Sequence, residues 1–197
     1  MMRPIALAAL LALPAPLSAQ WSVGVSFGVA RHFGGAVSTA DSTPGSVHPG
    51  RPTLLGLTVG HDWGAGQVRA DLQLSYGSPG LAVEIPGGAF LDTKAVRFYS
   101  GSPEVTVRLT RVGDDGALRV GGGGDVVLWA ITGGDARMRV GGHVTAVYEW
   151  PVAGRFLGDL QAGVSLTPSL FDASDVSPPF ERRMLLRPSV SIGFRYR

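Results

Sequence analysis

The chain has 197 residues, of which 16% are charged, and its 17 Lys and Arg against 15 Asp and Glu give a formal net charge of +2. This balance excludes the strongly basic surface by which proteins hold nucleic acid, so no nucleic-acid partner is expected. The sequence contains no Cys, which excludes disulfides, a thiol nucleophile and the lipid anchor of a lipoprotein. The charged fraction is also low for a soluble domain, in which about a quarter of the residues are charged.

The first residues have the pattern of a secretory signal peptide. Arg3 precedes an apolar run at residues 5–13, and Leu17, Ser18 and Ala19 suit cleavage before Gln20. The run is too short for a transmembrane helix, which needs about 20 apolar residues. We therefore expect residues 1–19 to be a signal peptide and residues 20–197 to form one exported domain.

From Gln20 onward, bulky apolar residues alternate with small or polar ones at a period of two, which predicts β-strands. The expected strands cover residues 21–30, 55–63, 68–77, 97–110, 117–129, 137–150, 156–167 and 189–196. The glycine run at residues 121–124 blurs the register of the fifth strand and favours a β-bulge there.

The connections between these strands differ in length. In chain order they span residues 34–52, 64–66, 78–95, 112–116, 132–135, 151–154 and 168–183. The first, third and last are long and rich in Gly, Pro, Ser and Asp, whereas the others are short enough for hairpin turns. One end of the molecule is therefore expected to carry short hairpin turns and the other end long loops.

Alternation alone also fits a β-sandwich or a lipocalin-like barrel. The expected strands are longer than the five to six residues usual in globular proteins, and their apolar faces carry no charge through their middles. Aromatic residues near the strand ends suggest the girdles of a membrane protein; they are Trp21, Trp63, Tyr76, Trp150, Phe156 and Tyr196, with Phe98 or Tyr99. Strands facing lipid must close on themselves, so the predicted fold is all-β, an eight-stranded antiparallel up-and-down transmembrane β-barrel.

The end of the chain carries the most specific similarity. Gly193, Phe194 and Tyr196 resemble the C-terminal assembly signal of the small eight-stranded bacterial outer membrane barrels of the OmpX type and the OmpA transmembrane-domain type, although this chain ends in Arg197 where that family usually has an aromatic residue. The resemblance implies location in the bacterial outer membrane, contact with its lipid, and the barrel-assembly machinery as a partner.

The faces opposite the apolar ones carry charges of both signs. These residues are Arg69, Asp71, Glu104, Arg108, Arg119, Asp125, Arg137, Arg139, Glu149, Asp159 and Arg195. An eight-stranded barrel is only wide enough for its inward side chains to fill, so we interpret them as a charged plug, the alternative being a narrow path for ions or small solutes.

Catalytic, cofactor and metal sites are not expected. The four histidines are scattered, with His32 and His48 at the first long loop, His61 facing outward and His143 facing inward. A lumen site of His143 with Ser165 and Glu149 is conceivable but has no evident entry route, and the glycine run lacks the context of a phosphate loop.

The predicted function is therefore that of a non-enzymatic structural or surface-interaction barrel. A narrow channel is the alternative, and a lipid-modifying enzyme is a third hypothesis. Because loops on a rigid scaffold commonly carry binding function, an extracellular ligand would contact residues 34–52 and 168–183.

Overall fold

The computed structural model describes residues 21–39, 45–64, 66–113 and 116–197. The expected signal peptide at residues 1–19 lies outside the described residues, as do parts of three expected connections. The elements are β1 (Trp21–Ala30), β2 (Phe33–Ser38), β3 (Ser46–Pro49), β4 (Thr53–Trp63), β5 (Val68–Gly77), β6 (Leu81–Ile85), β7 (Gly88–Asp92), β8 (Val96–Val112), β9 (Gly116–Ile131), β10 (Arg137–Ala153), β11 (Phe156–Thr167), the 3-10 helix η2 (Ala173–Asp175) and β12 (Phe180–Tyr196). Within this part of the chain, no helix has the length and apolar character to cross a membrane.

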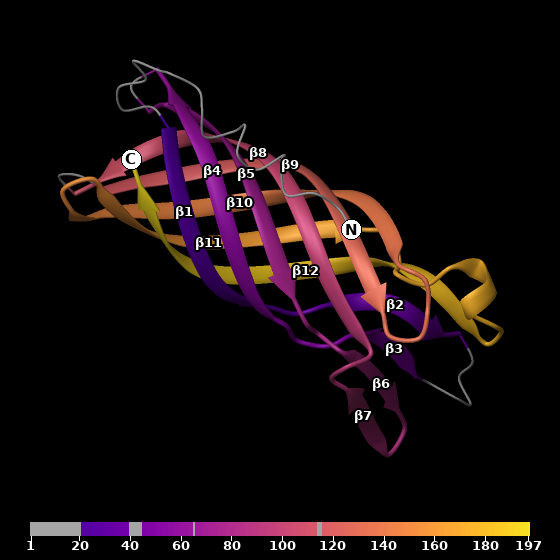
Figure 1. Cartoon of the computed structure of the whole chain (residues 1–197). Coiled ribbons are helices and arrows are strands. Elements are labelled where there is room, and N and C mark those ends of the chain that lie inside the picture. Colours follow the sequence, from indigo (N-terminus) through magenta and orange to yellow (C-terminus); the bar gives the residue numbers. More distant parts are fainter. Residues whose placement is uncertain (1–20, 40–44, 65, 114–115) are drawn as a thin grey trace, which may run out of the picture.

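Eight of the strands form a closed ring. Their order is β1, β4, β5, β8, β9, β10, β11, β12, and β12 pairs back onto β1 from Val23↔Tyr196 to Ala30↔Ser189. Every pairing in the ring is antiparallel, and apart from the closing pair β12–β1 each joins ring strands that follow one another along the chain, with β2–β3 and β6–β7 lying between ring strands. Figure 1 shows the tilted strands wrapping around one axis. The predicted eight-stranded up-and-down barrel is therefore confirmed.

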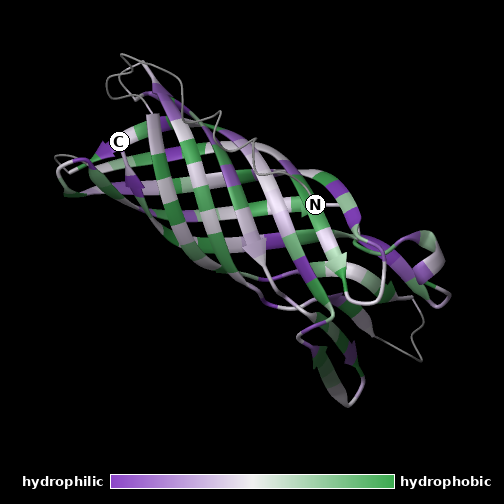
Figure 2. Cartoon of the chain, viewed as in Figure 1, coloured by the Kyte–Doolittle hydropathy of each residue, from purple (hydrophilic) through white to green (hydrophobic). Residues whose placement is uncertain are grey.

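The barrel has its apolar residues outside and its charges inside. Figure 2 shows the resulting alternation of hydrophobic and other residues along each strand. Val25 and Val140 are about 60% exposed on the outer face, whereas Arg69 and Arg119 are 1% exposed inside. A soluble barrel or sandwich has the opposite arrangement, so this distribution is that of a barrel surrounded by lipid.

Aromatic side chains lie at both ends of the outer face. At the end with the short turns, called here the short-turn end, Phe156 packs on Tyr196 with ring centroids 5.1 Å apart, and Trp21, Trp63 and Trp150 lie at the same end. Tyr76 packs on Tyr99 at 5.3 Å toward the other end, the long-loop end. Tyr99 points outward and is 50% exposed, while its neighbour Phe98 is fully buried inside.

Two of the expected loops contain strands, which corrects the prediction. Residues 34–52 include most of β2 and all of β3, and residues 78–95 include β6 and β7. These four strands extend the sheet outward from β12 in the order β2, β3, β6, β7, at the lower right of Figure 1. The turn-forming composition concealed them, because short strands alternate there with Gly and Pro.

The last strand also begins earlier than predicted, at Phe180 and not at Ser189. Its first half pairs with β2 through Arg183↔Gly35, so it remains a strand beyond the point where β1 ends. The connection expected at residues 168–183 is therefore shorter by its last four residues.

The β-bulge expected at residues 121–124 is absent. The register of β9 against β10 runs without a shift from Ala117 to Trp129, and the shift on the β8 side lies between Arg108 and Thr110. Gly121, Gly122 and Gly123 allow the neighbouring strands to approach closely instead, since a Cβ at Gly123 would lie 2.9 Å from the Cα of Glu104 on β8.

Candidate functional site

The short-turn end of the lumen is crossed by a network of buried ion pairs. Arg69 on β5 donates to Asp62 at 2.9 Å and also to Glu149 on β10. Arg119 donates through Nε to Glu149 at 2.9 Å and through Nη2 to the carbonyl of Gly66 at 2.6 Å. Both arginines are 1% exposed, so each carboxylate compensates charge that water cannot reach.

The last residue of the chain joins this network. Arg197 approaches Glu149 at 3.4 Å and Asp62 at 3.6 Å. Three cations thus share two carboxylates at the short-turn end. Because each carboxylate has two or more partners, the network connects β4, β5, β9, β10 and the segment after β12.

A second pair lies deeper in the lumen. Arg195 donates to Asp71 at 2.6 Å and to Ser22 at 3.1 Å. Asp159 lies beside Gly193, where an added Cβ would be 2.7 Å from its carboxylate, and both Asp71 and Asp159 line a cavity of about 20 Å³. This space is the size of one water molecule, so packing closes the lumen here.

His143 holds the middle layer together. Its Nε2 lies 3.0 Å from Glu104 and its Nδ1 lies 3.0 Å from Asp125. Asp125 also accepts a hydrogen bond from Ser102 at 2.6 Å and lies 3.8 Å from Arg187. The imidazole therefore bridges β8 and β9 from its position on β10.

This arrangement differs from that of a hydrolase. Ser102 donates to the carboxylate of Asp125 and not to the imidazole, and Ser165 accepts from Arg187 at 3.0 Å. Glu149 lies in the ion-pair network at the short-turn end, away from His143. The conceivable grouping of His143, Ser165 and Glu149 is therefore not brought together, and among the residues that the structure describes no cluster of His, Asp or Glu has the form of a metal site.

Above His143 the lumen contains a small polar cavity of about 50 Å³. Its wall includes the hydroxyls of seven serines, Ser26, Ser75, Ser100, Ser102, Ser165, Ser189 and Ser191. Such a space can hold a few ordered waters.

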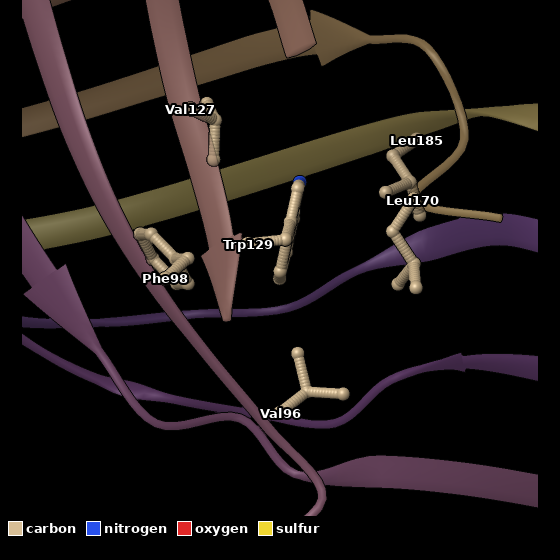
Figure 3. Packing of buried hydrophobic residues seen from close by; sticks show 6 residues of the cluster. All are labelled: Val96, Phe98, Val127, Trp129, Leu170 and Leu185. Atoms are coloured by element: carbon tan, nitrogen blue, oxygen red, sulfur yellow. The ribbon is translucent and has the colours of Figure 1, made fainter. Parts of the chain in front are cut away.

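The long-loop end of the lumen is closed by an apolar cluster, called here the cork. It consists of Val96, Phe98, Val127, Trp129, Leu170 and Leu185, and Figure 3 shows these side chains converging from β8, β9, β12 and the connection before β12. The Phe98 and Trp129 ring centroids lie 5.2 Å apart, and both residues are at most 1% exposed. Buried apolar packing of this kind excludes water from the mouth of the barrel.

His32 packs against one side of the cork. It is 2% exposed, its Nδ1 bonds the carbonyl of Gly50 at 3.0 Å, and its ring meets the edge of Trp129 at 5.6 Å. Burial lowers the pKa of His32 from 6.5 to about 4, so the ring is neutral at neutral pH.

Two arginines expected in the lumen bind the last outer connection instead. Arg139 donates to the carbonyl of Ser169 and to Asp172, both at 2.6 Å. Arg137 donates to Asp175 and to the carbonyl of Leu170, the latter at 3.0 Å, and its hydrogen bond lowers the pKa of Asp175. The pair holds residues 169–175 down, with Leu170 inserted into the cork.

The predicted lumen residues therefore divide into groups. Arg69, Arg119 and Glu149 meet at the short-turn end, Asp71 pairs with Arg195, and Glu104 and Asp125 meet through His143. Arg108 bonds the carbonyl of Gly66 at 3.2 Å, and Arg137 and Arg139 lie above the lumen. In the assembly signal, Gly193 is buried while Phe194 and Tyr196 face outward.

Sequence reasoning missed Asp62, Arg187 and Arg197 as members of these groups. Asp62 is on the polar face of a predicted strand, so the alternation of residue types in that strand could have identified it as a lumen residue. Arg187 preceded the predicted start of the last strand, and only the longer β12 reveals that it faces inward.

Comparison with known proteins identifies the fold. No protein-family model matches the sequence, and no relative is found among curated proteins. Among solved structures, neisserial surface protein A (NspA) is 12% identical with a TM-score of 0.58, covering 89% of this chain and 96% of that one. The outer membrane protein OprG from Pseudomonas aeruginosa is 12% identical with a TM-score of 0.54, covering 90% and 95% respectively. The chain therefore has the fold of the eight-stranded outer membrane β-barrel proteins, the family that its C-terminal residues resemble.

Proposed function

We propose that this protein is a bacterial outer membrane barrel with a closed lumen, which acts through its extracellular surface and neither transports solutes nor catalyses a reaction. In the outer membrane, the short-turn end of the barrel faces the periplasm and the long-loop end faces the cell exterior. Export by the signal peptide at residues 1–19, insertion into lipid, and recognition of Gly193, Phe194 and Tyr196 by the barrel-assembly machinery belong to the same proposal.

The observation that carries the proposal is the double closure of the lumen. The ion-pair network of Arg69, Arg119 and Glu149 fills one end, and the cork fills the other. Two lumen cavities between them, lined by residues that the structure describes, have volumes of about 20 and 50 Å³. A hydrated ion would have to displace both barriers in order to pass.

Surface action is supported by the sheet extension outside the barrel. The β6–β7 hairpin exposes Ile85, Phe90 and Leu91 by more than half of their surface. Exposed apolar side chains grouped in this way mark contact surfaces on proteins. By contrast, the connection before β12 is held down by Arg137 and Arg139, so the hairpin and the first loop are the favoured contact region for an extracellular ligand.

Planar bilayers test the proposal. The mature protein, shown to be folded by a shift in gel mobility on heating, is expected to produce no conductance steps. Discrete and reproducible steps from the heat-modifiable form would reject the closed lumen and favour the narrow channel.

Adhesion tests the surface action. Vesicles carrying the barrel are expected to bind an immobilised polysaccharide or protein layer better than empty vesicles do. The variant Phe90→Ser/Leu91→Ser is expected to lose this advantage while keeping its heat-modifiability. Equal binding by this variant and the wild type would contradict a role for the hairpin, and wild-type binding no better than that of empty vesicles would contradict the surface action.

A further inference from the structure

We propose that Arg31 and Arg51 form a binding site for the phosphate group of an anionic lipid in the outer leaflet. The site lies on the lipid-facing wall, where β1 ends and β4 begins. The inference rests on the proposed location in the outer membrane. It goes beyond the proposed function because a closed lumen does not by itself imply a lipid-binding site at Arg31 and Arg51.

The first observation is a notch in the wall of the barrel. Pairing of β1 with β4 ends at Val29↔Thr53, and pairing of β1 with β12 ends at Ala30↔Ser189. Beyond these points β12 turns to pair with β2, and a groove of about 510 Å³ opens on the outer surface. Its apolar walls include Val29 and Val190, 59% and 50% exposed, which continue the lipid-facing surface below.

The second observation is the charge at the head of this groove. Arg31 and Arg51 line it, and both also line a second cavity of about 350 Å³ toward the β6–β7 hairpin. Both side chains are exposed, and neither guanidinium has a carboxylate within 4.0 Å among the residues that the structure describes. The carboxylate in the second cavity, Glu84, lies 3.4 Å from His48.

The depth of the arginines matches that of lipid headgroups. Arg31 follows Trp21, at the opposite interface, by ten residues. At about 3.3 Å per residue and a tilt of about 40°, this separation is about 25 Å along the barrel axis, the height of the apolar band of such barrels. Arg31 therefore lies at the upper edge of the band, where anionic headgroups begin.

The local structure also orients one guanidinium. Arg31 lies over the ring of Phe33, with its central carbon 4.7 Å from the ring centroid, and Phe33 is 41% exposed. An aromatic ring at the interface holds the planar guanidinium in place and leaves its edge donors free for phosphate oxygens. The arginines thus supply the polar contacts, and the groove below accommodates the first carbons of an acyl chain.

Native mass spectrometry of the detergent-purified protein with lipid A, a diphosphorylated glycolipid, tests the site. The wild type is expected to retain the lipid, and Arg31→Gln/Arg51→Gln is expected to bind it at least about tenfold more weakly, because charge-assisted hydrogen bonds to phosphate are lost. The control Arg97→Gln/Arg111→Gln removes the same charge from two exposed arginines that do not line the groove and is expected to bind as the wild type does.

Three results would overturn the site: unchanged binding by Arg31→Gln/Arg51→Gln, an equal loss in both double variants, or displacement of the lipid by inorganic phosphate at matched concentration. The second would indicate general attraction between charges, and the third an anion site that does not recognise lipid. The shift in gel mobility on heating and the conductance in planar bilayers are measured on the same protein preparations. A failure of the proposed function therefore appears in those measurements, independently of the lipid result.

Discussion

Arg69 on β5 and Glu149 on β10 connect two strands that are not neighbours in the sheet. Their contact spans the lumen, and Arg119 bonds the same carboxylate from β9 at 2.9 Å. In a soluble barrel this space would be filled by apolar side chains. Here the outer face is apolar, so charges neutralised by pairing take the place of a hydrophobic core.

Replacing Glu149 should therefore destabilise the barrel strongly. In Glu149→Gln, Arg69 and Arg119 stay buried but lose one of the two carboxylates that they share, and removal of one partner from a buried pair costs about 3–5 kcal/mol. Urea unfolding of the protein refolded into vesicles measures the loss. The control Glu84→Gln changes an exposed carboxylate and is expected to alter the free energy of unfolding little. A loss near zero for Glu149→Gln would mean that water solvates the network.

The cork should contribute stability without being the only barrier to ions. Trp129→Ala leaves a cavity against Phe98 and is expected to cost about 3–5 kcal/mol, measured by urea unfolding. The variant should stay silent in planar bilayers, because the ion-pair network still closes the short-turn end. Conductance steps from Trp129→Ala alone would show that the cork is the sole gate. Trp63→Ala, 47% exposed on the outer face, is the control and should cost less.

Alternation of residue types in the sequence predicted the ring because it reports which face of a strand each side chain occupies. It separated Tyr76 and Tyr196 outside from Asp71 and Arg195 inside, and closure followed from the absence of charge on the outer face. The eighth strand was recognised only from Ser189, since Pro188 and the arginines before it interrupt the pattern.

Contacts across the lumen could not be predicted in the same way. Whether His143 meets Glu104 or Glu149 depends on the stagger of the strands around the barrel, which a period of two does not encode. The cork could not be predicted for the same reason, because Leu170 lies in a connection and joins Trp129 in the apolar cluster only when the chain is folded.

Releasing the last outer connection should loosen it locally and leave the barrel intact. Arg137→Gln/Arg139→Gln removes the ion pairs to Asp175 and Asp172. These carboxylates are partly exposed, so we expect a loss of at most about 1 kcal/mol in the free energy of unfolding. Cleavage by an added protease within residues 169–179 should accelerate, whereas Arg97→Gln should be cleaved as the wild type is. Unchanged cleavage would show that Leu170 in the cork is sufficient to hold the connection.

The neutral His32 should make the stability of the barrel depend on pH. Its folded pKa of about 4 lies below the unfolded value of 6.5, so the unfolded chain binds the additional proton. The contribution of His32 is therefore fully present above pH 6.5 and is lost as the pH falls from 6.5 toward 4, with a total of about 3 kcal/mol.

Comparison with His32→Gln isolates this contribution from that of other titrating groups. Burial opposes the charged ring most, and repulsion by Arg187 and His48 acts in the same direction. The variant can retain a hydrogen bond to Gly50 without titrating, so its free energy of unfolding should fall less than that of the wild type between pH 7 and pH 4.5. Parallel pH profiles for the two proteins would indicate that His32 is hydrated in the folded state and that the cork does not exclude water from it.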